Sequence, residues 1–295
     1  MRAVSTVLDT GVFLLLVGAA MLTLAVPAGP LPFADADAAD PTADVLATST
    51  ADVQYSLAPG ARQADEELVS FPRTGGPAFD RTAHGTLADH LGTATVETLT
   101  VDGRRVTHTG DGFRTAVANA TRTALRGRGH LAQVRAVWEP YPDAPMRGEV
   151  TVGPSPPPAT TVHAATLTVD SGLPAARQQA RTVAVSGSYA SVAEAVAVRV
   201  VDGLFPPEAA EDALLGDYPV DRLVAYRYRQ MGRLLGANVT AAVRANDVER
   251  ANAALTDSLA DRLAADMRTQ FESPAAAAER VRVGTVRVTV RTWSP

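Results

Sequence analysis

RVRVGTVRVTVRTW, residues 280–293, predicts a β-strand near the end of the chain, and its pairing decides the fold class. Valine alternates with other residues along it, but the alternation slips by one residue at Gly284-Thr285, where we expect a β-bulge. Arginines Arg282, Arg287 and Arg291 fall on the opposite face, so the strand is expected to be half exposed. It follows a helical section, so it most simply pairs with strands formed earlier and closes the domain.

The partner strands are expected between residues 130 and 169. In His130 to Trp138, small and aromatic residues alternate with polar ones, which predicts a strand with one buried face. Residues 149–152 and 161–169 predict further strands. An Asp-Gly pair at residues 102–103, between two alternating runs, predicts a β-hairpin. Together these segments predict one mostly antiparallel sheet.

Residues 186–272 are expected to be mostly helical. Ser191 and Glu194 form a capping-box pattern ahead of a valine-rich and alanine-rich helix, which should be buried. Helical spacing of apolar residues then predicts one helix from Pro219 to about residue 245 and another after Asn246, packed as a two-helix hairpin. We therefore expect an α+β fold, a mostly antiparallel sheet with a packed helical section, preceded by one N-terminal transmembrane helix.

The segment Thr10–Phe33, TGVFLLLVGAAMLTLAVPAGPLPF, carries no charge. About 20 apolar residues are needed to cross a bilayer, and this run meets that length. The positive Arg2 precedes the run and acidic residues follow it, which orients the bulk of the chain outside the cell. We expect a leader and transmembrane helix at residues 1–33, an acidic flexible stalk at 34–51 and an extracytoplasmic domain at 52–295. The expected location is the cell membrane, with a single pass.

Three fates remain open for this N-terminal segment. It can be a permanent anchor, a pilin-type leader cut on the cytoplasmic side just before the apolar helix, or a signal peptide removed after the run. Ala34-Asp35-Ala36 and Val26-Pro27-Ala28 are both compatible with signal-peptide cleavage. All three alternatives place the body of the chain outside the cell.

The first residues, Arg2 to Asp9 (RAVSTVLD), resemble the start of archaeal type IV pilins and TadE-like pseudopilins. The resemblance implies cleavage between Ala3 and Val4, and it implies that Asp9 pairs with the terminal amine of a neighbouring subunit. The leader here is only three residues long, shorter than is usual in those families. The segments VWEPYPDAP (137–145) and VHAATLTVDSG (162–172) are similar to an uncharacterised haloarchaeal family found beside type IV pilus-like assembly components.

Composition limits the functions open to the chain. The net charge is −5, which gives no broad electrostatic basis for binding nucleic acid. There is no cysteine, so disulfides and thiolate metal sites are excluded. All 27 basic residues are arginine, which is typical of a GC-rich genome and of a salt-loving host. Hydrophobic residues make up 46% of the chain, enough to form a core.

No motif in the sequence predicts catalysis. His84 and His90 are expected around one short helix but not on one face of it, and the other three histidines are expected on separate strands. No glycine-rich phosphate loop is present. We therefore expect no enzyme activity, no catalytic residue, no metal, no cofactor and no identifiable small-molecule substrate. Asn119 and Asn238 match the N-glycosylation pattern, although both are expected in helices.

The function expected first is a structural or interaction subunit of the cell surface, such as a minor pilin-like component of a type IV pilus-like assembly. Its partners would be the membrane and other pilin-like subunits. Gly18, Ala19 and Ala20 would allow close helix contact in the middle of the apolar run. An anchored or secreted binding module for an envelope component is the alternative, and an exported hydrolase without a recognisable motif is a weaker one.

Overall fold

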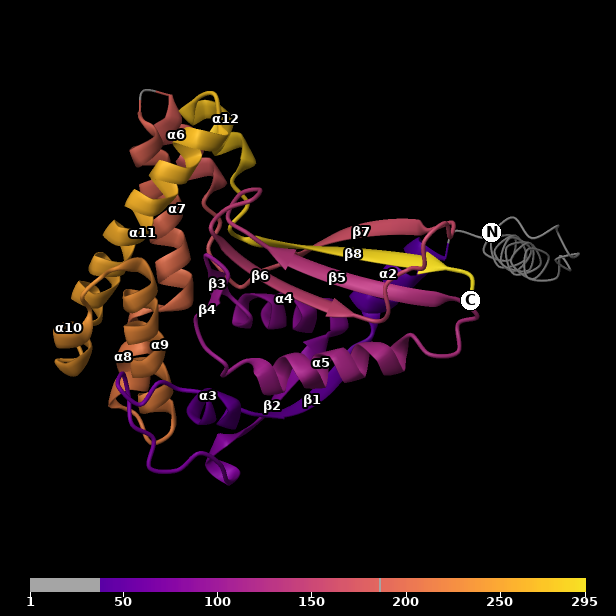
Figure 1. Ribbon diagram of the computed structural model, residues 1–295, viewed down its shortest axis with the longest axis horizontal. Coiled ribbons are helices and arrows are strands. Elements are labelled where there is room, and N and C mark those ends of the chain that lie inside the picture. Colours follow the sequence, from indigo (N-terminus) through magenta and orange to yellow (C-terminus); the bar gives the residue numbers. More distant parts are fainter. Residues whose placement is uncertain (1–37, 186) are drawn as a thin grey trace, which may run out of the picture. The chain divides into compact units, whose positions relative to one another are not determined.

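The protein is described by a computed structural model over residues 38–185 and 187–295. This part of the chain combines helices with antiparallel sheets, as expected (Figure 1). In it, the larger sheet has the strand order β4-β3-β6-β5-β8-β7, and all its paired strands are antiparallel. The strands are β3 (Thr100–Val101), β4 (Arg104–Arg105), β5 (Leu131–Trp138), β6 (Met146–Val152), β7 (His163–Asp170) and β8 (Thr285–Trp293).

The last strand closes the domain, as predicted. β8 lies between β5 and β7, so the C-terminal segment forms an inner strand of the sheet (Figure 1). The predicted β-bulge is wrong, because β8 begins only at Thr285. Before it, residues 282–285 form a turn in which the Thr285 amide donates to the Arg282 carbonyl, 3.2 Å, and Val281 caps the preceding helix. Val281 and Val283 are nevertheless fully buried, which explains why they continue the valine pattern.

The two faces of the larger sheet differ in what covers them. Helices α2 (Ala39–Thr48), α4 (Leu87–Glu97) and α5 (Asp111–Ala124) pack on one face. α4 contacts β5, β6, β7 and β8, whereas α2 contacts β7 and β8 and α5 contacts β6. The inward side chains of β5 and β8 are fully buried: Val134, Ala136, Trp138, Val286, Val288 and Val290. Most alternate residues of the same strands stay partly or fully exposed, although Gln133 and Trp293 are buried. The period of two therefore separates a core face from a polar face.

The predicted hairpin at residues 102–103 is confirmed. Asp102 and Gly103 join β3 to β4 with φ values of 47° and 74°. Positive φ at both central residues is what a tight two-residue hairpin turn requires, and an Asp-Gly pair supplies it at low cost. The turn directs the chain into α5, which follows on the core side of the sheet.

The helical section consists of seven helices within residues 38–185 and 187–295. They are α6 (Arg177–Ala184), α7 (Tyr189–Leu204), α8 (Pro207–Leu215), α9 (Val220–Leu235), α10 (Thr240–Arg244), α11 (Val248–Gln270) and α12 (Pro274–Arg280). The predicted pairing is wrong in part, because α11 packs mainly on α7 and makes fewer contacts with α9. The buried face of α7 consists largely of alanine and valine, which lets the two helix backbones approach closely.

The caps of this section also differ from the prediction. The capping box of α7 joins Ser188 to Ser191 rather than Ser191 to Glu194, so the helix begins earlier than expected. α9 ends at Leu235, followed by Gly236 in the left-handed conformation. Asp247, not Asn246, caps α11 by accepting a hydrogen bond from the Arg250 amide, 3.0 Å.

The segment expected to be a flexible stalk is partly folded. Within residues 34–51, helix α2 occupies Ala39–Thr48 and buries Ala39, Thr42 and Leu46 against the sheet and α4. These three small or apolar side chains recur at helical spacing, so one stripe of an acidic segment joins the core. Residues 34–37 lie outside the described residues.

A separate two-stranded sheet follows α2. It pairs β1 (Thr50–Ser56) with β2 (Asp80–Thr86) in antiparallel register, from Thr50 opposite Thr86 to Ser56 opposite Asp80. The loop between them, residues 57–79, contains the short helices α3 (Ala58–Arg62) and η1 (Pro77–Phe79).

The expected transmembrane helix, residues 10–33, lies outside the described residues. Among the helices of residues 38–185 and 187–295, none has the length and apolar character needed to cross a bilayer.

Candidate functional site

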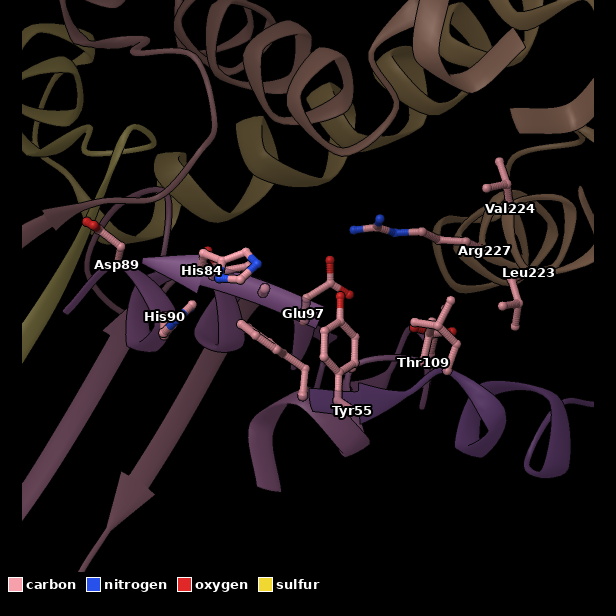
Figure 2. Close-up of a pocket in the computed structure, with 15 residues that line it drawn as sticks. Tyr55, His84, Asp89, His90, Glu97, Thr109, Leu223, Val224 and Arg227 are labelled. Carbon is pink, nitrogen blue, oxygen red and sulfur yellow. The ribbon is translucent and has the colours of Figure 1, made fainter. Parts of the chain in front are cut away.

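A pocket of about 330 Å³ opens between the β1–β2 sheet, α4, the start of α5, and α9 (Figure 2). Its walls come from β1, from the continuous segment of β2 and α4, from residues 107–113, and from the distant helix α9. Its volume falls at the lower end of the range for small-molecule sites, which are typically mostly apolar with a few polar groups. The lining of this pocket fits that description.

The apolar part of the pocket centres on two aromatic rings. Tyr55 in β1 and Phe113 in α5 lie with ring centroids 4.9 Å apart at an interplanar angle of 58°. Leu223 and Val224 of α9 line the pocket beside them. Tyr55 reaches this place because it shares a strand face with buried Val53, which packs in the core.

Three polar groups of the lining have partners within the protein. The Nδ1 of His84 lies 2.5 Å from the Oδ1 of Asp52. Asp89 receives a hydrogen bond of 2.8 Å from the Thr86 hydroxyl, and the Nε2 of His90 lies 2.9 Å from the Ala51 carbonyl oxygen. These contacts orient the three side chains. A ligand that bound to the same atoms would have to break the contacts within the protein.

Two charged groups of the lining have no such partner. Glu97 ends α4 and Arg227 projects from α9, and Figure 2 shows both directed into the pocket from different walls. Neither forms an ion pair or a hydrogen bond through its side chain with any described residue, although Arg227 lies over the Phe205 ring at 5.5 Å. Burial and the nearby Glu97 carboxylate raise the pKa of Tyr55, so its hydroxyl stays protonated.

A second feature is the polar face of the larger sheet, which we call the arginine face. It comprises five arginines and two glutamates: Arg135, Arg147, Arg282, Arg287, Arg291, Glu139 and Glu149. Five positive and two negative charges leave a surplus of three, on a chain whose net charge is −5. A depression of about 200 Å³ lies among these arginines.

The glutamates of the arginine face bind only some of the arginines. Glu149 accepts from Arg135 at 2.6 Å and from Arg147 at 2.8 Å. Glu139 pairs with Arg282. The hydrogen bond from Arg135 lowers the pKa of Glu149, partial burial opposes this, and Arg147 lowers it further.

Arg287 and Arg291 remain without an ion pair in the part of the chain that the structure describes. Both project from β8, and Arg287 is exposed to solvent. The neighbouring outward positions of β7 and β8 include Thr166, Thr168, Thr285 and Thr289, with Asp170 opposite Thr285, so the face is polar and its arginines make it positive.

Several residues singled out in the sequence lie outside the described residues. These are Ala3, Val4, Asp9, Gly18, Ala19 and Ala20. Asn119 is exposed on α5, where its Oδ1 accepts a hydrogen bond from Arg122 at 2.7 Å. Asn238 is exposed too, but it precedes α10 in a loop rather than in the expected helix.

The histidines do not gather into a metal site within residues 38–185 and 187–295, where no three His, Asp or Glu side chains are suitably grouped. His84 and His90 do line one pocket, from β2 and α4. Sequence reasoning missed the pocket because its key residues, Tyr55, Glu97 and Arg227, carry no shared motif.

Comparison with protein families places most of the chain in a family. The Family of unknown function (DUF7284) matches residues 8–293. No curated protein matches the chain, and no solved structure does.

Proposed function

The chain belongs to DUF7284, a family of unknown function. We propose that it is a membrane-anchored interaction subunit. Its domain lies outside the cell and binds an acidic partner protein through the arginine face. The observation that carries the proposal is the pair of uncompensated arginines, Arg287 and Arg291, on an open sheet face. The finer assignment, a minor pilin-like component of a type IV pilus-like assembly, rests on the N-terminal resemblance.

The physical argument is one of charge complementarity. An acidic chain gains nothing in its own fold from a positive surplus on one face, because like charges repel. A partner that presents carboxylates would be steered to this face and would replace water around the two free guanidinium groups. Arginine suits this role, since its planar group binds carboxylates through two parallel hydrogen bonds.

The docking role can be tested by cross-linking in the native host. The chain has no cysteine, so Thr151→Cys places a single reactive thiol at an exposed position paired with Arg135 of the arginine face. We expect this thiol to cross-link to another protein, and the double reversal Arg287→Glu/Arg291→Glu to abolish the adduct. The matched reversal Arg126→Glu/Arg128→Glu, at exposed arginines after α5, should leave it intact.

Two outcomes would contradict docking through this face. One is the absence of any adduct at Thr151→Cys. The other is an adduct that survives reversal of both β8 arginines, or that forms equally from Glu211→Cys on α8, an exposed position away from the sheet.

Anchoring and assembly need their own measurements. The mass of the N-terminal peptide of the mature protein should show a start at Met1 or Val4, which keeps the apolar run. A start near Gly29 or Asp37 would refute the anchor. Gly18→Leu should disrupt assembly or co-purification with neighbouring subunits, and an unchanged result would argue against helix packing at that point.

The pocket favours the second candidate function, a module that binds an envelope component or a small ligand outside the cell. Its apolar floor and unpaired charges are the specific observation behind this alternative.

A further inference from the structure

We propose that the pocket between the β1–β2 sheet, α4, α5 and α9 binds a small zwitterion with an apolar body, such as a hydrophobic α-amino acid. The inference stands on the pocket alone and does not depend on docking through the arginine face. Three properties carry it: two unpaired charges of opposite sign, an aromatic floor, and a volume that suits one such molecule.

The charges come first. Glu97 and Arg227 are both only partly exposed, yet neither meets an opposite charge within hydrogen-bonding distance among the described residues. Burying a charged group costs free energy when it loses water without gaining an ion pair or a hydrogen bond, and for Arg227 the Phe205 ring is a compensating contact. Arginine and glutamate on facing walls could have paired with each other, but the pocket keeps them apart. A ligand carrying an ammonium group and a carboxylate would compensate both at once.

The rest of the polar lining does not compete for these charges. His84, Asp89 and His90 each have a partner within the protein, as described above. Tyr55 contributes a protonated hydroxyl near Glu97, and its hydroxyl makes no hydrogen bond with any described residue. Glu97 would therefore attract the ammonium group of a ligand, and Arg227 its carboxylate.

The floor determines which apolar side chain accompanies the two charged groups. The Tyr55 and Phe113 rings, together with Leu223 and Val224, offer an apolar surface for an aromatic or branched side chain. A dry engineered cavity of about 150 Å³ holds one benzene molecule. The present pocket, at about 330 Å³, leaves room for a ring and two small charged groups.

Other ligand classes fit less well. A simple anion would leave Glu97 uncompensated and would be repelled by it. A simple cation would leave Arg227 uncompensated and would be repelled by it. A neutral apolar molecule would bury both charges without supplying an ion pair to either. Only a molecule that carries both charges satisfies the two walls together.

The test uses the full chain in detergent and isothermal titration calorimetry with three probes. They are L-phenylalanine, N-acetyl-L-phenylalanine, which lacks the ammonium charge, and L-phenylalaninamide, which lacks the carboxylate. We expect L-phenylalanine to bind, and each blocked analogue to bind about tenfold more weakly or worse. Titration into detergent alone corrects for partitioning.

Variants then assign each end of the ligand. In Glu97→Gln, blocking the ammonium group of the ligand should no longer weaken binding, whereas blocking the carboxylate should still weaken it. We refer to these two losses of affinity as the penalties. Arg227→Gln should do the reverse. Arg222→Gln is the matched control, because this residue is exposed on the same helix and does not line the pocket. It should keep both penalties.

The comparison of probes on the unaltered chain decides the proposal even where a variant fails to fold. Absence of L-phenylalanine binding up to about 10 mM, which corresponds to a very weak site, would overturn it. So would equal affinity for the three probes. Loss of both penalties in Arg222→Gln would show that the charges act from a distance, and would also overturn the assignment to Glu97 and Arg227.

Discussion

Gly148→Ala should destabilise the protein by driving α4 away from the sheet. Gly148 lies in β6, where a Cβ would fall 2.9 Å from the carbonyl carbon of Thr95 and closer still to its oxygen. Real Cβ atoms do not approach that closely, and the neighbour is helix backbone rather than a flexible side chain. One of the two elements must therefore move.

The size of the effect follows from two opposing contributions. Overpacking a well-packed core costs about 1–3 kcal/mol, and a backbone neighbour argues for about 3. Alanine in a strand gains about 0.5–1 kcal/mol over glycine, which leaves a net loss of about 2 kcal/mol. For a domain of this size, that lowers the unfolding temperature by about 4–8 °C.

The assay is thermal unfolding of the full chain, followed by circular dichroism. Gly75→Ala is the matched control, because a Cβ there meets nothing within 4 Å. Its unfolding temperature should stay within about 1 °C of the unaltered chain. An unchanged or higher unfolding temperature in Gly148→Ala would refute the close packing of α4 on β6. Since α4 also carries Glu97, a displaced helix should weaken ligand binding in the pocket as well.

Two further predictions concern buried and exposed polar contacts. Asn252→Ala should cost about 3–5 kcal/mol in urea unfolding, because it leaves two buried groups unpaired, the Tyr228 hydroxyl (2.8 Å) and the Phe205 carbonyl (2.9 Å). A cost below about 1 kcal/mol would show that water replaces the amide. Glu149→Gln should lower the unfolding temperature most at neutral pH, because the pKa of Glu149 is lower in the folded protein than in the unfolded chain. The resulting stabilisation is fully present above the unfolded pKa of about 4.3 and is lost as the pH falls through the folded pKa. A difference between the two proteins that stays constant from pH 7 down to about pH 3 would contradict this reasoning.

Local pattern was a good guide wherever one segment carried the whole signal. The alternation in residues 285–293 predicted both the strand and the side that its arginines occupy, because a strand places successive side chains on opposite faces. The Asp102-Gly103 turn was equally local, since two positive φ values suffice to make it. The ends of elements were predicted less accurately. Before β8, buried Val281 and Val283 continue the valine alternation of the strand, although they lie outside it.

Partner choice was decided only by the tertiary structure. The apolar face of α11 could pack on α9 or on α7, and the close approach allowed by alanine and valine in α7 decided between them. Helix α2 belongs to the core for a related reason, because three side chains fit a site that the sheet and α4 create.

The candidate sites also divide into features that one segment carries and features that depend on how segments pack. From sequence alone, the apolar run at residues 10–33, the missing cysteines and the polar arginine side of β8 were all evident, since each is a property of one segment or of composition. The pocket was not, because Tyr55, Glu97 and Arg227 come from a strand and two helices separated by many residues. Their meeting depends on how those elements pack, and packing is determined by the complementary shapes of whole surfaces rather than by any local period.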